Sequence, residues 1–187
     1  MGGFFGAVCK QDALADVFFG TDYHSHLGTR RAGIAVYDKE LGLQRKIHNI
    51  ENSPFRTKFE KVFEEMQGTS AIGCISDTFP QPLLIRSNHG TYAICTVGVV
   101  KNEDELINRF LSNSGIHFDA MSGGKVNSNE LIAALIDQKP TFAEGIRFAQ
   151  TQLLLRAAMP VPCTKSWMWK FPLRICATAT PPVWWPM

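Results

Sequence analysis

The sequence predicts an α+β protein in which antiparallel sheets pack against helices. Short apolar segments of strand-like composition occur in clusters rather than in strict alternation with helices, whereas a doubly wound fold requires regular β-α-β alternation. Three later segments begin with Asn or Thr followed three residues on by Glu, a pattern typical of helix starts. At 187 residues the chain is long enough to bury one substantial core.

The first elements alternate in type. Residues 3–8 read as a buried strand, and apolar residues at helical spacing then predict a helix that ends by Gly28. Two strands follow, at residues 32–38 and 44–52, joined by a turn around Gly42.

The next helix has clear boundary signals. Ser53 is expected to cap it, with Pro54 at its first position, and Gly68 is expected to end it. Proline fits there because the first helical N–H has no partner inside the helix. Three short apolar strands are then expected, at residues 70–76, 83–87 and 92–100.

Three capped helices follow these strands. Each is predicted from a cap residue and a Glu three positions later, before an apolar stripe. The pairs are Asn102 with Glu105, Asn127 with Glu130, and Thr141 with Glu144, and the last helix is expected over residues 142–155.

The composition changes sharply after about residue 152. The segment from residue 157 holds all four tryptophans and six of the ten prolines, but no Asp, Glu or Gly. We therefore expect one domain over residues 1–152 and an atypical Trp/Pro-rich tail over 153–187 that forms no domain. A change of reading frame in the coding sequence would produce such a switch, and so would an unusual natural tail.

Charge and cysteine usage exclude several classes. A net charge of +2 without a dense basic run argues against nucleic-acid binding. No apolar stretch approaches the length of a membrane span. The five cysteines are scattered without a C-x-x-C pair, which indicates reduced thiols and a cytoplasmic protein rather than disulfides or zinc. We expect neither a metal nor a cofactor.

Five blocks, in order, carry a family resemblance. They are MGGFFGA, SHLGTRRAGIAVYD, SAIGCISD with PQPLLI, YAICTVGVVKNEDEL and KVNSNELIAALI. Together they resemble the glutaminase domain of class II glutamine amidotransferases, and most of all that of the amidophosphoribosyltransferases of purine biosynthesis. The resemblance implies the N-terminal nucleophile hydrolase fold, a four-layer αββα sandwich of two antiparallel sheets. It also implies that the first strand is central and carries an N-terminal Cys, whose thiolate attacks the glutamine amide.

The sequence departs from the family where that chemistry takes place. The family's nucleophilic Cys falls on Gly2, and two Arg positions fall on Leu27 and Ser76. The oxyanion-hole Asn falls on Val97, and the Asp that binds the substrate amino group falls on Ser128. Glycines of the expected pocket remain at Gly28 and Gly98. The resemblance thus implies a retained scaffold with a vestigial pocket, no intact catalytic residue and poor binding of glutamine.

Other reactive residues have ordinary interpretations. Cys9 lies about 20 Å along an extended strand from Gly2 and is expected to be a structural thiol. His24 and His26 are two residues apart and lack a third metal ligand nearby. Arg30 and Arg31 either grip an anion or form a solvated basic face.

Three functions follow from these observations. The first is a catalytically inactive glutaminase-like domain, either regulatory or a partner for another subunit or a further copy. The second is an amidohydrolase of the same fold that uses an unconventional nucleophile. The third is a structural or interaction domain unrelated to glutamine chemistry.

Overall fold

The computed structural model describes residues 2–114, 117–119, 121–156 and 174–179. These residues fall into two compact units. The first unit contains the described residues up to Val97 together with residues 175–179, and the second contains those from Gly98 to Arg174. Each unit is described separately.

The first unit is built on a four-stranded antiparallel sheet. Its strand order is β1 (Gly2–Val8), β4 (Ser70–Ser76), β2 (Arg31–Asp38) and β3 (Gly42–Asn49). β1 and β4 pair along all seven residues without a bulge, from Gly2 opposite Ser76 to Val8 opposite Ser70.

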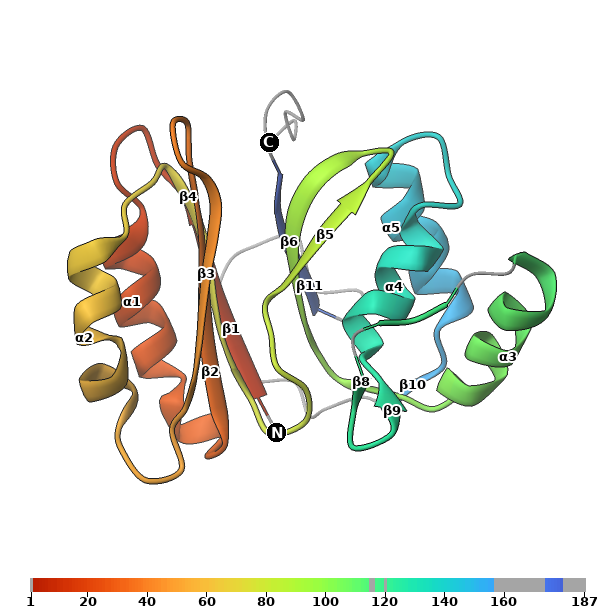
Figure 1. Ribbon diagram of the computed structural model, residues 1–187, viewed down its shortest axis with the longest axis horizontal. Helices are drawn as coiled ribbons and strands as arrows, with labels where there is room; N and C mark the ends of the chain where they lie inside the picture. Colours follow the sequence, from red (N-terminus) through yellow and green to blue (C-terminus); the bar gives the residue numbers. More distant parts are fainter. Residues whose placement is uncertain (1, 115–116, 120, 157–173, 180–187) are drawn as a thin grey trace. The chain divides into compact units, whose positions relative to one another are not determined.

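Two helices cover one face of this sheet (Figure 1). They are α1 (Leu14–Tyr23) and α2 (Phe55–Glu65), and the short 3-10 helix η1 (Ser25–Leu27) follows α1. Their aromatic side chains pack together, with the rings of Phe55 and Phe59 stacked 4.6 Å apart. This core, with Ile34 and Ile75 from the sheet, excludes water from the helix-covered face.

A second sheet covers the opposite face (Figure 1). Its order is β11 (Arg174–Ala179), β6 (Gly90–Val97) and β5 (Leu83–Ser87), and β5 pairs with β6 antiparallel. Buried Ile72 and Cys74 of the first sheet pack against Ala93 and Cys95 of the second. The first unit therefore has a helix layer and two sheet layers.

A buried glutamine connects the two sheets. Gln81 is 4% exposed, and its side-chain amide donates to the Thr96 carbonyl oxygen and accepts from the Thr96 N–H, both at 3.0 Å. A Cβ atom placed on Gly33 of β2 would collide with the Gln81 carbonyl oxygen. Gln81 thus bonds β6 on one side and lies directly against β2 on the other, which only glycine at position 33 allows.

The second unit is mainly helical. It contains α3 (Glu103–Ser114), α4 (Ser128–Ile136) and α5 (Phe142–Gln152), and α4 packs on α5. Two short antiparallel ribbons accompany the helices: β7 (Val99–Val100) with β10 (Leu155–Arg156), and β8 (Met121–Ser122) with β9 (Lys125–Val126).

The predicted class, helices with antiparallel sheets, is confirmed. Two of the predicted caps are also present: the Asn127 side chain accepts from the Asn129 N–H at 3.0 Å, and the Thr141 side chain accepts from the Glu144 N–H at 3.3 Å. The first strand, expected to be central, is an outer strand of the four-stranded sheet among the described residues. The fourth layer of the αββα sandwich stays a prediction, and so does the division at residue 152. Most of the tail, residues 157–173 and 180–187, lies outside the described residues.

One helix start and one side-chain cap differ from the prediction. Pro54 is the N-cap of α2 because its ψ of 153° is extended, so the helix begins one residue later than expected and Ser53 does not cap it. The Asn102 side chain bonds elsewhere, donating to the Gln152 carbonyl oxygen at 2.8 Å and accepting from the Leu154 N–H at 2.9 Å.

Two element ends differ as well. The strand expected over residues 92–100 is divided at Gly98, whose φ is 157°. The helix expected to reach residue 155 ends at Gln152, because Leu155 and Arg156 pair with Val100 and Val99 instead.

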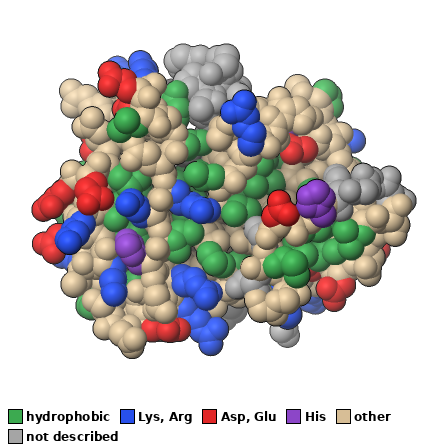
Figure 2. Space-filling model, in the orientation of Figure 1, with side chains coloured by type: hydrophobic (Ala, Val, Ile, Leu, Met, Phe, Trp, Pro, Cys, Tyr) green, Lys and Arg blue, Asp and Glu red, His purple; other side chains and the backbone are tan. Residues whose placement is uncertain are grey.

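Figure 2 shows Lys and Arg side chains in several separate groups, interspersed with hydrophobic and acidic ones. Within the part of the chain that the structure describes, no helix is both long enough and apolar enough to span a bilayer.

The contact between Gln81 and Thr96 predicts a large effect of one substitution. Gln81→Ala leaves the part-buried N–H and C=O of Thr96 without this partner, at a cost of up to about 1–3 kcal/mol each. We expect the free energy of unfolding, measured by urea denaturation, to fall by about 2–4 kcal/mol. Gln67→Ala removes an exposed glutamine of the same unit and should change it by less than about 0.5 kcal/mol. Equal effects of the two substitutions would contradict the assigned role of Gln81.

Candidate functional site

The position expected for the nucleophile lies at one end of the first sheet. Gly2, the first residue of β1, is paired with Ser76, the last residue of β4. On the other side of β4, Ser76 is opposite Arg31, the first residue of β2. Three strand ends therefore bring Gly2, Ser76 and Arg31 into one row.

The backbone around Gly2 is fitted to glycine. A Cβ atom at this position would lie 2.5 Å from the Ile75 carbonyl oxygen and 3.7 Å from the Ser76 Cα atom. The first distance is well inside van der Waals contact, and the obstacle is backbone rather than a movable side chain. Any side chain at position 2, including that of cysteine, would require β1 to shift against β4.

Leu27 lies beside this strand end. It closes η1 and is half-buried. A Cβ atom on Gly3 would come within 2.9 Å of the Leu27 Cδ1 atom and 3.0 Å of the His24 Cδ2 atom. The leucine side chain and the imidazole therefore cover β1 one residue after Gly2. Gly28 follows, buried and with extended backbone.

The Ser76 hydroxyl is part of a local turn. Ser76 is 3% exposed, its Oγ lies 3.3 Å from the Thr78 Oγ1, and it accepts from the Thr78 N–H at 3.3 Å. A serine nucleophile needs a neighbouring base to remove its proton. Thr78 provides no base, so this hydroxyl is not activated.

Asp77 ties two loops together at the same end. Its carboxylate accepts from the N–H groups of Thr29 at 2.7 Å and Arg30 at 3.1 Å, while the Arg31 guanidinium donates to the Thr78 carbonyl oxygen at 3.0 Å. Partial burial raises the pKa of Asp77, but hydrogen bonds to the carboxylate, including these two, lower it more, and the net pKa is below its usual value. The ionised carboxylate thus holds the segment after Gly28 against the segment after β4.

Val97 and Gly98 stand at the end of β6. Val97 is half-buried and directly follows Thr96, the residue bonded by Gln81. Within the first unit, β6 contacts both β1 and β4. The expected oxyanion position therefore holds an apolar side chain on a strand that packs against the strands of Gly2 and Ser76.

Ser128 belongs to the second unit. It is the first residue of α4, and its hydroxyl donates to the Glu103 carboxylate at 2.7 Å. The structure thus brings Gly2, Leu27 and Ser76 together, whereas a place for Ser128 and Gly98 in the same pocket stays a prediction.

The alternative nucleophile, Cys9, lies at the far end of β1. Seven residue steps of about 3.3 Å separate it from Gly2, a span of about 23 Å. Burial raises the pKa of its thiol, and so do the hydrogen bond to Asp16, 3.6 Å away, and the negative charges of Asp16 and Asp12. The thiol is therefore protonated at neutral pH and is a poor nucleophile.

The two histidines and two arginines have local partners. His24 Nδ1 lies 2.8 Å from the Gly20 carbonyl oxygen, and His26 Nδ1 lies 2.8 Å from that of Tyr23. Arg30 is 3.8 Å from Glu51 on the surface. Among the described residues no group of three His, Cys, Asp or Glu side chains is placed to hold a metal.

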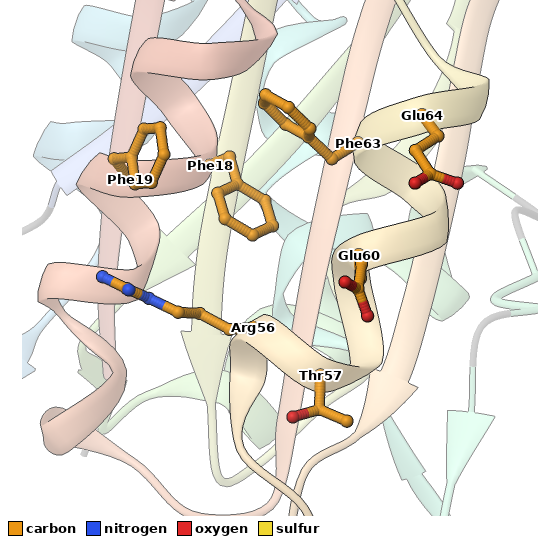
Figure 3. A pocket seen from close by; sticks show the side chains of 7 residues that line it. All are labelled: Phe18, Phe19, Arg56, Thr57, Glu60, Phe63 and Glu64. Atoms are coloured by element: carbon orange, nitrogen blue, oxygen red, sulfur yellow. The ribbon is translucent and has the colours of Figure 1, made fainter.

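A surface groove of about 400 Å³ lies elsewhere, between α1 and α2. Its lining includes Phe18 and Phe19 from α1 and Glu60 and Phe63 from α2 (Figure 3). The groove contains none of the residues predicted for the site, and sequence reasoning did not identify it. The sequence feature that could have indicated this groove is a set of aromatic residues at helical spacing, of which Phe19 is exposed.

Comparison with known proteins identifies the fold. No protein-family model and no curated protein matches the chain. Among the solved structures that match, two are similar over 83% of the chain. The glutamine phosphoribosylpyrophosphate amidotransferase of B. subtilis, complexed with ADP and GMP, is 26% identical with a TM-score of 0.67. An allosteric regulatory enzyme of purine biosynthesis is 25% identical with a TM-score of 0.68.

The chain spans about a third of these proteins, 33% and 34% of their respective lengths. The similarity supports a domain related to amidophosphoribosyltransferase, with the N-terminal nucleophile amidotransferase fold. The family resemblance expected from the five sequence blocks is confirmed at this level.

The lowered pKa of Asp77 predicts a pH-dependent contribution to stability. Because the pKa is lower in the folded state, this stability is present above the unfolded value of about 3.9 and is lost as pH falls through the folded value. We expect Asp77→Asn to reduce the free energy of unfolding by about 0.5–2 kcal/mol at pH 7 and to have little effect below about pH 3. Urea denaturation across this pH range measures both. Glu64→Gln, at an exposed carboxylate, is the control, and a pH-independent effect of Asp77→Asn would contradict the assignment.

Proposed function

We propose that residues 1–152 form a glutaminase-like domain, related to that of amidophosphoribosyltransferase, that does not hydrolyse glutamine. The main support is Gly2. Hydrolysis by this family's route begins with attack by a thiolate on the amide carbon, and the nucleophile position carries a hydrogen atom. The carbonyl oxygen of Ile75 lies where a side chain would begin.

No other described side chain at this end of the sheet is suited to replace the missing thiol. The Ser76 hydroxyl is bonded within its own turn, to Thr78. Cys9 is at the opposite end of β1 and is protonated at neutral pH. These observations argue against the second function, an amidohydrolase with an unconventional nucleophile.

The chemistry of the pocket is also unsuited to glutamine. The amino acid carries a carboxylate and an ammonium group, and burying either without a partner is costly. Leu27 and Val97 are apolar, and Ser76 is uncharged. Arg31, which is opposite Ser76, uses its guanidinium to bond the Thr78 carbonyl oxygen on the surface.

A domain that keeps its framework without turnover acts through contacts with other molecules. We therefore assign it a regulatory or subunit role, with another copy or a further protein subunit as partner rather than a nucleic acid, a membrane or a cofactor. A purely structural domain, unrelated to glutamine, is the competing function. It would bind no glutamine analogue even after the family's charged residues are restored.

The first test is glutamine turnover by the full chain. We expect no release of ammonia above the buffer rate and no covalent labelling by an electrophilic glutamine analogue, measured by intact-mass spectrometry. An active class II glutaminase serves as the positive control. Turnover that disappears in Cys9→Ser would show that the chain is an enzyme with a displaced nucleophile, and would overturn the proposal.

The second test restores the nucleophile. Because a Cβ at position 2 meets the Ile75 carbonyl oxygen, Gly2→Cys should lower the free energy of unfolding by about 1–3 kcal/mol and should not produce glutaminase activity. Gly6→Ala, at an exposed position of the same strand, is the matched control for stability. An active Gly2→Cys variant would show that the remaining pocket still binds glutamine, contrary to the proposal.

A further inference from the structure

The groove between α1 and α2 has an aromatic floor. The rings of Phe18, Phe19 and Phe63 lie together between the two helices, with centroids 5.0–6.3 Å apart (Figure 3). Phe18 is buried, but Phe19 is 55% exposed and Phe63 is 39% exposed. Apolar surface that is gathered at one place, in contrast to single scattered residues, is typical of interaction sites.

One wall of the groove carries negative charge. Arg56, Glu60 and Glu64 of α2 line it. Arg56 already has partners, since its guanidinium is 2.7 Å from the Asp22 carboxylate and 5.9 Å from the centre of the Phe19 ring. Within the described part of the chain, the carboxylates of Glu60 and Glu64 take part in no ion pair or hydrogen bond.

The negative charge is a local property of this wall. The chain as a whole has a net charge of +2, but Lys58 and Lys61 of α2 lie outside the groove lining. Glu60 and Glu64 are one helical turn apart, a spacing at which like charges repel each other. A cation between the two carboxylates would offset this repulsion, so the wall favours a basic partner.

The length of the groove suits a helix. From Arg56 to Glu64 it follows eight residue steps of α2, about 12 Å at 1.5 Å per residue. The apolar anchors of a docked amphipathic helix, at positions i, i+4 and i+7, span about 10 Å. Two turns of a partner helix would therefore place apolar side chains along the whole groove.

We propose that the α1–α2 groove binds an amphipathic helix of a partner protein that combines apolar anchors with lysine or arginine. The anchors cover Phe19 and Phe63, and the basic side chains reach Glu60 and Glu64. This inference rests on the proposed function, in which the domain acts through contact with another protein, and it adds the chemistry of that partner. Nucleic acids and anionic membranes are unsuited, because they would meet the two carboxylates as like charges.

A basic residue can use both the rings and the carboxylates of this groove. Arg56 is an example within the chain, because its guanidinium lies over the Phe19 ring and is paired with Asp22. A lysine or arginine of the partner would repeat this arrangement, with its aliphatic stem on the Phe63 ring and its charged head at Glu60. The groove therefore discriminates against an acidic helix that has the same apolar anchors.

The first experiment measures peptide binding to the full chain by fluorescence anisotropy. The probe is a synthetic amphipathic helix of about 15 residues, with Leu at positions i, i+4 and i+7 and Lys beside them, and a second peptide has Glu in place of each Lys. We expect the basic peptide to bind at least about tenfold more tightly at low salt, and this preference to shrink as salt is added. Equal binding of the two peptides, or no binding of the basic one, would refute the inference. Ammonia release from glutamine, measured on the same sample, tests the proposed function separately.

Substitutions test whether the peptide binds in the groove. Glu60→Gln with Glu64→Gln should weaken binding at least about fivefold and remove most of its salt dependence. Phe19→Ser should weaken it about tenfold, because an anchor contact is lost. Glu40→Gln with Glu105→Gln removes two exposed carboxylates elsewhere and should leave binding unchanged. Equal effects of the two double substitutions would show attraction by the whole chain and would refute the site.

A third measurement determines whether the groove is accessible in the full chain. Hydroxyl-radical footprinting, read by mass spectrometry, reports the exposure of individual side chains. Phe19 and Phe63 should be oxidised in the chain alone and protected by the basic peptide, whereas Leu41 and Leu111, which are exposed elsewhere, should not change. Protection of both phenylalanines without peptide would assign the groove to the chain itself and would overturn the proposal.

Discussion

The buried amide of Gln81 is the contact on which the arrangement of the first unit depends. It satisfies both the N–H and the C=O of Thr96, and its own carbonyl oxygen lies against Gly33. Because these groups are partly buried, leaving them unbonded would cost free energy. The pair of hydrogen bonds therefore favours a position of the second sheet that brings Thr96 to Gln81. The Arg45 guanidinium, which donates to the Pro82 carbonyl oxygen at 3.2 Å, holds the same segment to β3.

At the end of the sheet that carries Gly2, hydrogen bonds within the chain connect the loops. Asp77 joins the segment after Gly28 to the turn after β4, and Ser76 supports that turn. The polar groups are thus used for structure, while Leu27 supplies apolar bulk over β1. The polar groups of this region are bonded within the chain, so they need no ligand as a partner. That property agrees with the proposed role, in which the domain contacts another chain and does not hydrolyse glutamine.

Local sequence patterns predicted the helices and strands better than the contacts between them. Residues 70–76 form β4 with the expected bounds, because an uninterrupted apolar run between turn residues has few alternatives. α3 begins directly after Asn102, as expected, but the Asn102 side chain bonds residues 152–154, fifty positions away, instead of the first turn of the helix. Of the site, the adjacency of Gly2 and Ser76 followed from the family resemblance and not from any local pattern, since strand pairing across 70 residues leaves no periodic trace. The strand order has no local signal in the sequence either, and the described residues place β1 at an end of the four-stranded sheet, where the resemblance implied a central strand.

The surviving glycines, which carry much of the family resemblance, are explained by packing alone. A Cβ atom on Gly3 would press on Leu27, one on Gly33 would collide with the Gln81 carbonyl, and one on Gly73 would collide with the Thr21 hydroxyl of α1. None of these contacts involves a substrate. Each of these glycines lies where a helix, a loop or the second sheet approaches the first sheet too closely to leave room for a side chain. The spacing of the glycines therefore indicates the fold and not the activity. Activity depends on the side chains at the strand ends, where Gly2 stands in place of the family's cysteine.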